Sequence, residues 1–149
     1  MIPNTGTRVP AVLGKLEDLF TAAGLEIDWG DAPAAANKPN AVMLAPADPD
    51  TPGVFITYGR DRSLGNKIVE QIEVAVVVRA YSGDGDLAAR VAECGAMLDL
   101  IYTAVRTNQV VAQVWDQLEV GPNASWHPVY TERGTNCFVG VSLIASCLL

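Results

Sequence analysis

The stretch that decides the fold is residues 68–108, and its first part, residues 72–81, reads Ile-Glu-Val-Ala-Val-Val-Val-Arg-Ala-Tyr. Side chains along a β-strand point alternately to opposite faces, so every second residue shares a face. One face is then wholly apolar and consists of Ile72, Val74, Val76, Val78 and Ala80. The other face carries Glu73, Arg79 and Tyr81 and is expected to be at least partly in water. The sequence therefore predicts a long strand with one buried face.

A long amphipathic helix is predicted soon after this strand, from Leu87 to Arg106. Its apolar residues recur at helical spacing and form one stripe, which consists of Leu87, Val91, Cys94, Leu98, Ile101, Tyr102 and Val105. Residues 82–86 form the turn, in which Asp84 or Asp86 is the expected N-cap. Because the strand and the helix each have one apolar face, we expect them to cover each other. This unit fixes the fold class and contains no chemical motif.

The rest of the chain supplies another helix and several strands. A first helix is expected from Val9 to Ala23, with Pro10 in its first turn and Gly24 as its stop. Short strands are expected at 25–29, 42–45, 54–58, 114–120 and 126–131, the last of them broken by Pro128, and a long closing strand at 136–149. Residues 30–40, 46–53, 59–67 and 121–125 are expected to form loops or turns.

These elements predict one α+β domain that spans residues 1–149. We expect a largely antiparallel sheet of about four to six strands with two main helices packed on one face. The two long strands, 68–81 and 136–149, should lie side by side.

Composition and charge exclude several classes of protein. The chain has a formal net charge of −7 and is 50% apolar. Proteins that grip nucleic acid through its phosphates need clustered Lys and Arg, so this class is excluded. A negative surface would repel duplex DNA, which is useful only where DNA must pass without sticking. No apolar run reaches the ~20 residues of a membrane helix and no signal peptide is recognisable, so we expect a soluble, cytosolic chain with no membrane contact.

The three cysteines are Cys94, Cys137 and Cys147, and none forms a C-x-x-C pair. If the closing strand is continuous, Cys137 and Cys147 lie roughly 33 Å apart, far beyond the Cα separation of ~7 Å that a disulfide allows. We therefore expect buried, reduced cysteines that act as small apolar residues, and neither a disulfide framework nor a zinc site.

No residue pattern in the chain requires catalysis. The single histidine, His127, lies in Ser125-Trp126-His127-Pro128, without the motif or the orienting group that a nucleophilic pair needs. Asp84 and Asp86 lack the further ligands of a calcium loop, and helix capping explains them both. The sequence therefore predicts no enzyme activity, no cofactor and no metal site.

The polar loop 59–67 contains Gly65 and Lys67, which superficially suggest a phosphate-binding loop. The Walker pattern requires Lys directly after the last glycine, and here Asn66 intervenes. Two interpretations remain open. The loop is either a solvated hairpin connection or a locally positive lip, formed by Arg60, Arg62 and Lys67, that meets an acidic partner surface.

The layout from Val9 to the last residue resembles the tail terminator proteins of long-tailed bacteriophages. The resemblance rests on the early helix, the short strands, the strand 72–81 with its following helix, residues 126–130 (Trp-His-Pro-Val-Tyr) and the closing strand 138–148. It implies a ring, commonly a hexamer, that caps the last ring of the tail tube in the virion and stops its polymerisation. The implied partners are other copies of the chain, the major tail tube protein and the head-completion or connector protein, with DNA passing through the lumen without specific binding. The family has no catalytic residues.

A ring requires an interface whose rotation closes on itself, and strand edges, loops and exposed apolar groups are natural candidates. The predicted contacts are the strand 54–58, the loop 59–67, Trp115 and the wet face of the long strand. The individual candidates are Arg60, Arg62, Lys67, Glu73, Arg79, Tyr81 and Trp115.

Three alternatives remain, the first from neighbouring families and the other two from different classes of protein. The head-closure and tail-completion proteins are similar enough to fit the same layout. A small cytosolic ligand-binding module would need a pocket with convergent polar groups, which the sequence does not indicate. A hydrolase would have to use His127 or a cysteine.

Overall fold

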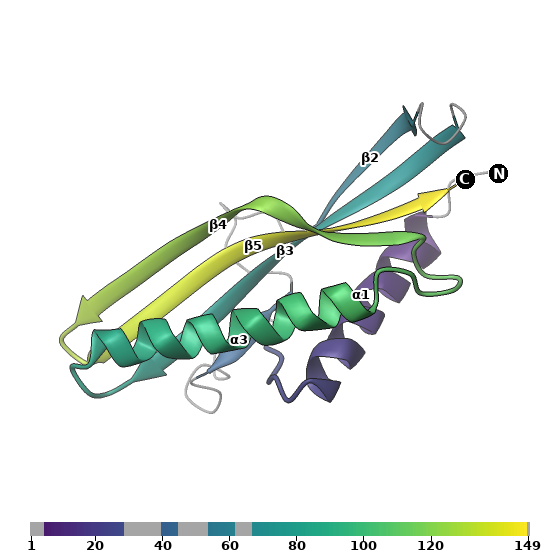
Figure 1. Ribbon diagram of the computed structural model, residues 1–149. Coiled ribbons are helices and arrows are strands. Elements are labelled where there is room, and N and C mark those ends of the chain that lie inside the picture. The colour runs from purple at the N-terminus through teal and green to yellow at the C-terminus, as the bar shows by residue number, and fades with distance from the viewer. Residues whose placement is uncertain (1–4, 29–39, 45–53, 62–66, 149) are drawn as a thin grey trace.

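The computed structural model describes residues 5–28, 40–44, 54–61 and 67–148. The elements in chain order are α1 (Thr5–Ala22), β1 (Ala41–Met43), β2 (Val54–Asp61), β3 (Lys67–Ser82), α3 (Leu87–Thr107), β4 (Gln117–Thr131) and β5 (Gly134–Leu148). The two helices and the five-stranded sheet confirm the predicted α+β class (Figure 1).

All pairings between the named strands are antiparallel, with the strand order β1-β3-β5-β4, and β2 also pairs with β3. The ladder between β3 and β5 runs from Val69 opposite Leu148 to Ser82 opposite Thr135. This confirms that the two long strands lie side by side. β4 pairs only with β5 among the described strands, so it forms one edge of the sheet.

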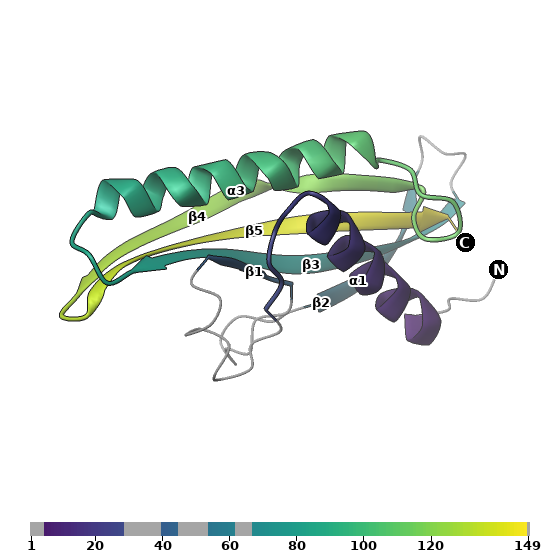
Figure 2. The same ribbon diagram turned by 90° about the horizontal axis from the view of Figure 1, so that it is seen from below.

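Both helices pack on the same face of the sheet, as Figure 2 shows. α3 contacts β3, β4 and β5, and its stripe residues Cys94, Leu98 and Ile101 are buried in the same core as the apolar face of β3. α1 contributes three buried residues, Val12, Leu16 and Phe20, to the same core. The opposite face of the sheet has no helix on it among the described elements, and we call it the helix-free face.

Local signals explain where α3 begins. The carboxylate of Asp86 accepts a hydrogen bond of 3.1 Å from the backbone N–H of Ala89, as an N-cap should. Of the two aspartates considered from the sequence, Asp86 is therefore the cap. α1 begins at Thr5 rather than Val9, with Pro10 inside it.

One prediction about the strands is wrong. Residues 121–125 do not form a turn between two short strands, because β4 runs unbroken from Gln117 to Thr131 with an irregularity between Val120 and Ala124. The pair Gly121-Pro122 is typical of a turn, but an edge strand tolerates both a bulge and a proline because its outer side has no ladder to maintain. Pro128 is likewise part of the strand, opposite Cys137.

Several smaller predictions also change. Of the expected strand 25–29, Ile27 forms an isolated parallel bridge with Val42, and Trp29 lies outside the described residues. The ends of the expected loop 59–67 are strand, since β2 continues to Asp61 and β3 begins at Lys67. The rest of that loop, at 62–66, and nearly all of the loops 30–40 and 46–53 lie outside the described residues.

All three cysteines are free and buried, as predicted. The thiol of Cys94 in α3 donates a hydrogen bond of 3.2 Å to the carbonyl oxygen of Cys137 in β5. In the described part of the chain, no helix combines the length and the apolar character needed to cross a membrane.

Candidate assembly surface

The most unusual surface is the outer segment of β4, by which we mean residues 122–131. Along β5 buried and partly exposed residues alternate, as expected for a strand with one face on a core. In β4 this alternation ends at the irregularity, and every residue from Pro122 to Thr131 is exposed. The outer segment therefore presents both faces and one free edge to solvent.

This segment lacks the usual protection of an edge strand. Soluble proteins commonly place charged side chains on exposed strand edges to prevent pairing with other chains. Residues 120–131 contain no Asp, Glu, Lys or Arg. Instead they include three of the exposed large apolar side chains of the molecule, Trp126, Val129 and Tyr130, and Tyr130 is 67% exposed. Two prolines and the bulge are the only features that discourage pairing.

The position of Pro128 shows which backbone groups face outward. Pro128 lies directly opposite Cys137 and has no N–H to donate. It must therefore occupy a pair in which the backbone polar groups point away from the neighbouring strand. Because these positions alternate, the backbone groups of Ala124, Trp126 and Tyr130 also point to the open edge. The residues between them, among them His127, direct their backbone N–H and C=O groups to β5.

Trp126 connects the outer segment to the helical layer. It lies opposite buried Val139, so its ring is on the helix side of the sheet. The ring lies close to Gly95 of α3, because a Cβ added to Gly95 would be 4.0 Å from Cη2 of Trp126. The ring nevertheless remains 42% exposed, so it leans on the helix and still offers a surface to a partner.

The bulge before the outer segment is closely packed. A Cβ on Gly121 would lie 3.1 Å from the Cβ of Ser142 on β5. Bulges bend a strand and increase its local twist, and they are common near functional edges. Here the bulge separates the part of β4 that contributes Leu118 to the core from the part that is exposed on both faces.

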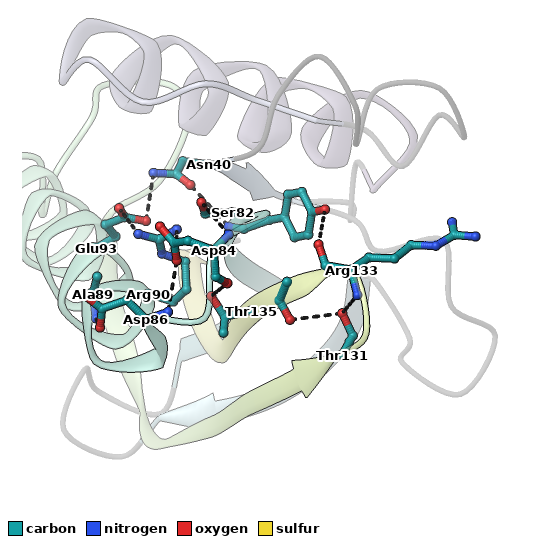
Figure 3. Close-up of polar contacts among 12 residues, drawn as sticks. Asn40, Ser82, Asp84, Asp86, Ala89, Arg90, Glu93, Thr131, Arg133 and Thr135 are labelled. Carbon is teal, nitrogen blue, oxygen red and sulfur yellow. Dashed lines mark hydrogen bonds and ion pairs between the residues drawn. The ribbon is translucent and has the colours of Figure 1, made fainter.

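The hairpin that follows the outer segment is held against the turn between β3 and α3 (Figure 3). The hydroxyl of Tyr81 donates to the backbone carbonyl oxygen of Arg133 at 3.2 Å. The hydroxyl of Thr135 donates to the backbone carbonyl oxygen of Asp84, also at 3.2 Å. Gly134 has φ +144, and a Cβ there would collide with the carbonyl oxygen of Ser82. The close approach fixes the direction in which the outer segment projects.

A second set of contacts fixes α3 beside the same turn. The guanidinium of Arg90 lies 3.0 Å from the carboxylate of Glu93 and 3.6 Å from that of Asp84. Asn40 bridges to this group, because its amide donates to Glu93 at 3.3 Å and its oxygen accepts from the N–H of Tyr81 at 3.3 Å. The pKa of Asp84 is lowered, first by a hydrogen bond from the backbone of Asp86. These contacts hold α3 and the turn before it together at the end of the molecule that carries the outer segment.

Arg79 does not have the surface position expected from the sequence. It is buried, and its guanidinium lies 3.1 Å from the carboxylate of Asp28, which is buried as well. A buried guanidinium requires a carboxylate close by. Residues 25–28 run beside β1 and so bring Asp28 to Arg79. In the isolated chain Arg79 is thus a structural residue rather than an exposed interface group.

Trp115 was expected to be exposed, and this expectation is wrong. Its side chain is only 2% exposed, and its Nε1–H donates a hydrogen bond of 2.9 Å to the carbonyl oxygen of Asn108. It lies just before β4 in the connection from α3, where a large ring closes the end of the core. Alternation along the expected strand 114–120 grouped Trp115 with the polar residues Gln117 and Glu119, whereas the strand begins only at Gln117.

The other predicted interface residues that the structure describes lie along β2 and β3. Glu73 and Tyr81 are half-buried in β3. The backbones of Arg60 and Lys67 lie in β2 and β3, but their side chains and all of Arg62 lie outside what the structure describes. The positive lip stays a prediction.

Sequence reasoning missed Trp126, Val129 and Tyr130 as surface groups. The available signal was the complete lack of charge over residues 120–131 in a chain of net charge −7. Dividing the segment into a turn and a short broken strand concealed that signal.

Ordinary catalytic chemistry finds little support in the described residues. In that part of the chain no three His, Cys, Asp or Glu side chains come together as metal ligands. Burial raises the pKa of the Cys94 thiol to about 12 and raises that of Cys147 as well, which disfavours the reactive thiolate. His127 is exposed on β4, opposite Phe138.

No known protein-family model matches the sequence, and no curated protein matches it either. The function is therefore inferred from the chain's own residues and their arrangement.

Proposed function

We propose that this protein is a structural virion component that forms a ring at the top of a phage tail tube. In that position it ends polymerisation of the tube and offers the surface to which the filled head joins. The single observation that supports this most is the outer segment of β4, which is uncharged, exposed on both faces and unpaired at its edge among the described strands.

A surface of this kind suits a subunit of a larger assembly. Interfaces are enriched in aromatic residues and depleted of charge at their centres, and Trp and Tyr supply much of the binding free energy. Trp126 and Tyr130 are such residues, and the backbone of a free strand edge can add hydrogen bonds to a neighbouring strand. Small ligands, in contrast, prefer concave pockets.

The helix-free face of the sheet fits a channel through which DNA slides. Among the described side chains that β3, β5 and the outer segment of β4 direct to this face, the only cation is Arg79, which is buried beside Asp28. These described parts of the face offer no accessible Lys or Arg to neutralise phosphates, so they would not hold the duplex. The net charge of −7 also disfavours binding of the DNA duplex.

A matched pair of variants tests the proposal. Trp126 and Leu100 are both 42% exposed, but Leu100 lies on α3. Trp126→Lys introduces a desolvation cost at the centre of the proposed contact, so it should abolish the capping of tail tubes. Leu100→Lys should leave capping intact. Negative-stain images of tubes mixed with each variant measure this, and thermal melting of the free proteins checks that both remain folded.

Two results would contradict the proposal. The first is that the unaltered chain never forms an annulus at a tube end or at the head–tail junction. The second is that Trp126→Lys, correctly folded, caps tubes as well as the unaltered chain does. An annulus found on the head side alone would favour the head-closure alternative.

A further inference from the structure

We infer that the free chain forms a two-fold dimer in which the outer segment of β4 pairs antiparallel with the same segment of a second copy, with His127 facing His127 of that copy at the axis. This contact goes beyond the proposed function and does not depend on it. It concerns what covers the outer segment before any other partner is present.

Charge selects a second copy as the occupant. Two chains of net charge −7 repel each other, so a stable contact between them should avoid further carboxylates. The outer segment carries no formal charge over residues 122–131, so two copies can approach there without facing carboxylates. An antiparallel strand pair is itself two-fold symmetric, so one edge is enough to build a closed contact.

The backbone pattern allows this pairing. The outward groups belong to Ala124, Trp126, Pro128 and Tyr130, and all of these follow the bulge, where the ladder with β5 is regular. An axis at His127 places outward residues opposite outward residues, as an antiparallel ladder requires. Ala124 and Tyr130 of the other copy can exchange two hydrogen bonds. The N–H of Trp126 can donate to the carbonyl oxygen of Pro128 of the other copy. Only the reciprocal hydrogen bond is absent, because proline has no N–H.

The side chains fit in the same register. On the helix side, the ring of Trp126 lies opposite the flat ring of Pro128 of the other copy, and Tyr130 lies opposite the small Ala124. Cross-strand pairs of an aromatic residue with a flat or small one avoid a clash and cover the exposed rings. An axis at Trp126 would instead place two indoles directly opposite each other. The register centred on His127 is therefore the one that the residues support.

The dimer would join two sheets edge to edge and cover Trp126 and Tyr130. Since an edge can pair with only one strand at a time, a tail partner that uses this segment must displace the second copy. The dimer thus protects an otherwise exposed strand from uncontrolled association.

Cysteine cross-linking tests both the contact and its register. His127 directs its backbone groups to β5, so the two copies of His127 form the close kind of pair, with Cα atoms about 4.5 Å apart, which suits a disulfide. His127→Cys should therefore give a disulfide-linked dimer under mild oxidation, doubling the chain mass of 15.8 kDa. Ser125→Cys alone should not, because its two copies would lie roughly 13 Å apart.

The controls are built into the chain. The native cysteines are all buried, so the unaltered protein should not cross-link. In this register Ser125 lies opposite Val129 of the other copy, so a mixture of Ser125→Cys and Val129→Cys chains should form the mixed dimer. A failure of His127→Cys to cross-link, or equal cross-linking by Ser125→Cys alone, would overturn the inference.

A second measurement needs no engineered cysteine. His127→Glu places two carboxylates opposite each other at the axis, and the mass measured by light scattering should fall by half relative to His127→Gln. A monomeric unaltered protein at high concentration would refute the dimer. Tube capping by such a monomer would still support the proposed function, so the two ideas fail separately.

Discussion

Gly134 shows how a single residue directs the exposed end of the molecule. Its φ of +144 favours glycine, and the Cα of Gly83 would lie 2.8 Å from an added Cβ. Gly134→Ala should therefore lower the free energy of unfolding by at least about 2 kcal/mol, from backbone strain and overpacking combined.

Urea denaturation measures this effect, and Gly85→Ala in the facing turn is the matched control. Gly85 has no atom within 4 Å of its added Cβ, so its substitution should change stability little. Equal losses for the two variants would contradict the idea that Gly134 is specifically constrained.

Single residues also mark where sequence reasoning ends. Asp86 could be predicted as a helix cap because capping depends on the next few residues alone. The burial of Arg79 depends on Asp28, which is 51 residues away in the sequence. Alternation along β3 placed Arg79 on the wetter face, and no local pattern indicates that a distant carboxylate will cover it.

At the scale of elements, the packing of α3 on β5 should make stability depend on alkaline pH. Burial raises the pKa of Cys94 from an ordinary 9.0 to about 12 and raises the pKa of Cys147, so folding favours the protonated thiols. The contribution of Cys94 is complete below pH 9 and is lost as pH rises toward 12, and the contribution of Cys147 is lost in the same direction. Each pH unit in the window of Cys94 should cost up to about 1.4 kcal/mol for that thiol.

Denaturant unfolding at several pH values between 8 and 11 checks the direction under reducing conditions. Cys94→Ala should make the decline shallower because it removes one of the two titrating groups. A variant with an equally steep decline would show that other groups cause it.

The long elements could be predicted because periodicity accumulates over many residues. β3, α3 and β5 each repeat their pattern over several turns or alternations, and their boundaries were predicted within a few residues. β4 was divided because Gly121 and Pro122 usually interrupt a strand. Whether they do depends on the place of the strand in the sheet, and the strand order comes from pairing rather than from local sequence.

At the scale of the whole molecule, the surface that meets a partner follows from the strand order. β4 is the edge strand, and every residue of its outer segment is exposed although the β5 residues opposite Trp126 and Pro128 are buried in the core. Charge composition could have indicated this surface, but only the sheet shows that it is a free edge. The predicted interface residues were taken mainly from β3, which is an inner strand.

Amide exchange should show an alternating pattern along the outer segment. In the His127→Glu variant, the outward N–H groups of Trp126 and Tyr130 should exchange quickly, whereas that of Val129 should be protected by β5. Assembly of the unaltered chain should slow the outward amides by at least about tenfold, the factor that corresponds to about 1.4 kcal/mol. Mass spectrometry of small peptides or NMR measures this. Uniform exchange along the segment would contradict the assigned backbone directions.

The two ends of the described chain lie together, away from the β4–β5 hairpin (Figure 1). Leu148 lies opposite Val69, and Arg8 of α1 lies 3.1 Å from the carboxylate of Glu70, so both ends are near the start of β3. Fusing a fluorescent reporter or an affinity handle to either end would therefore place it far from Trp126 and Tyr130. Labelled subunits could then be followed into particles, or used to recover native complexes, without obstructing the strand on which association is proposed to depend.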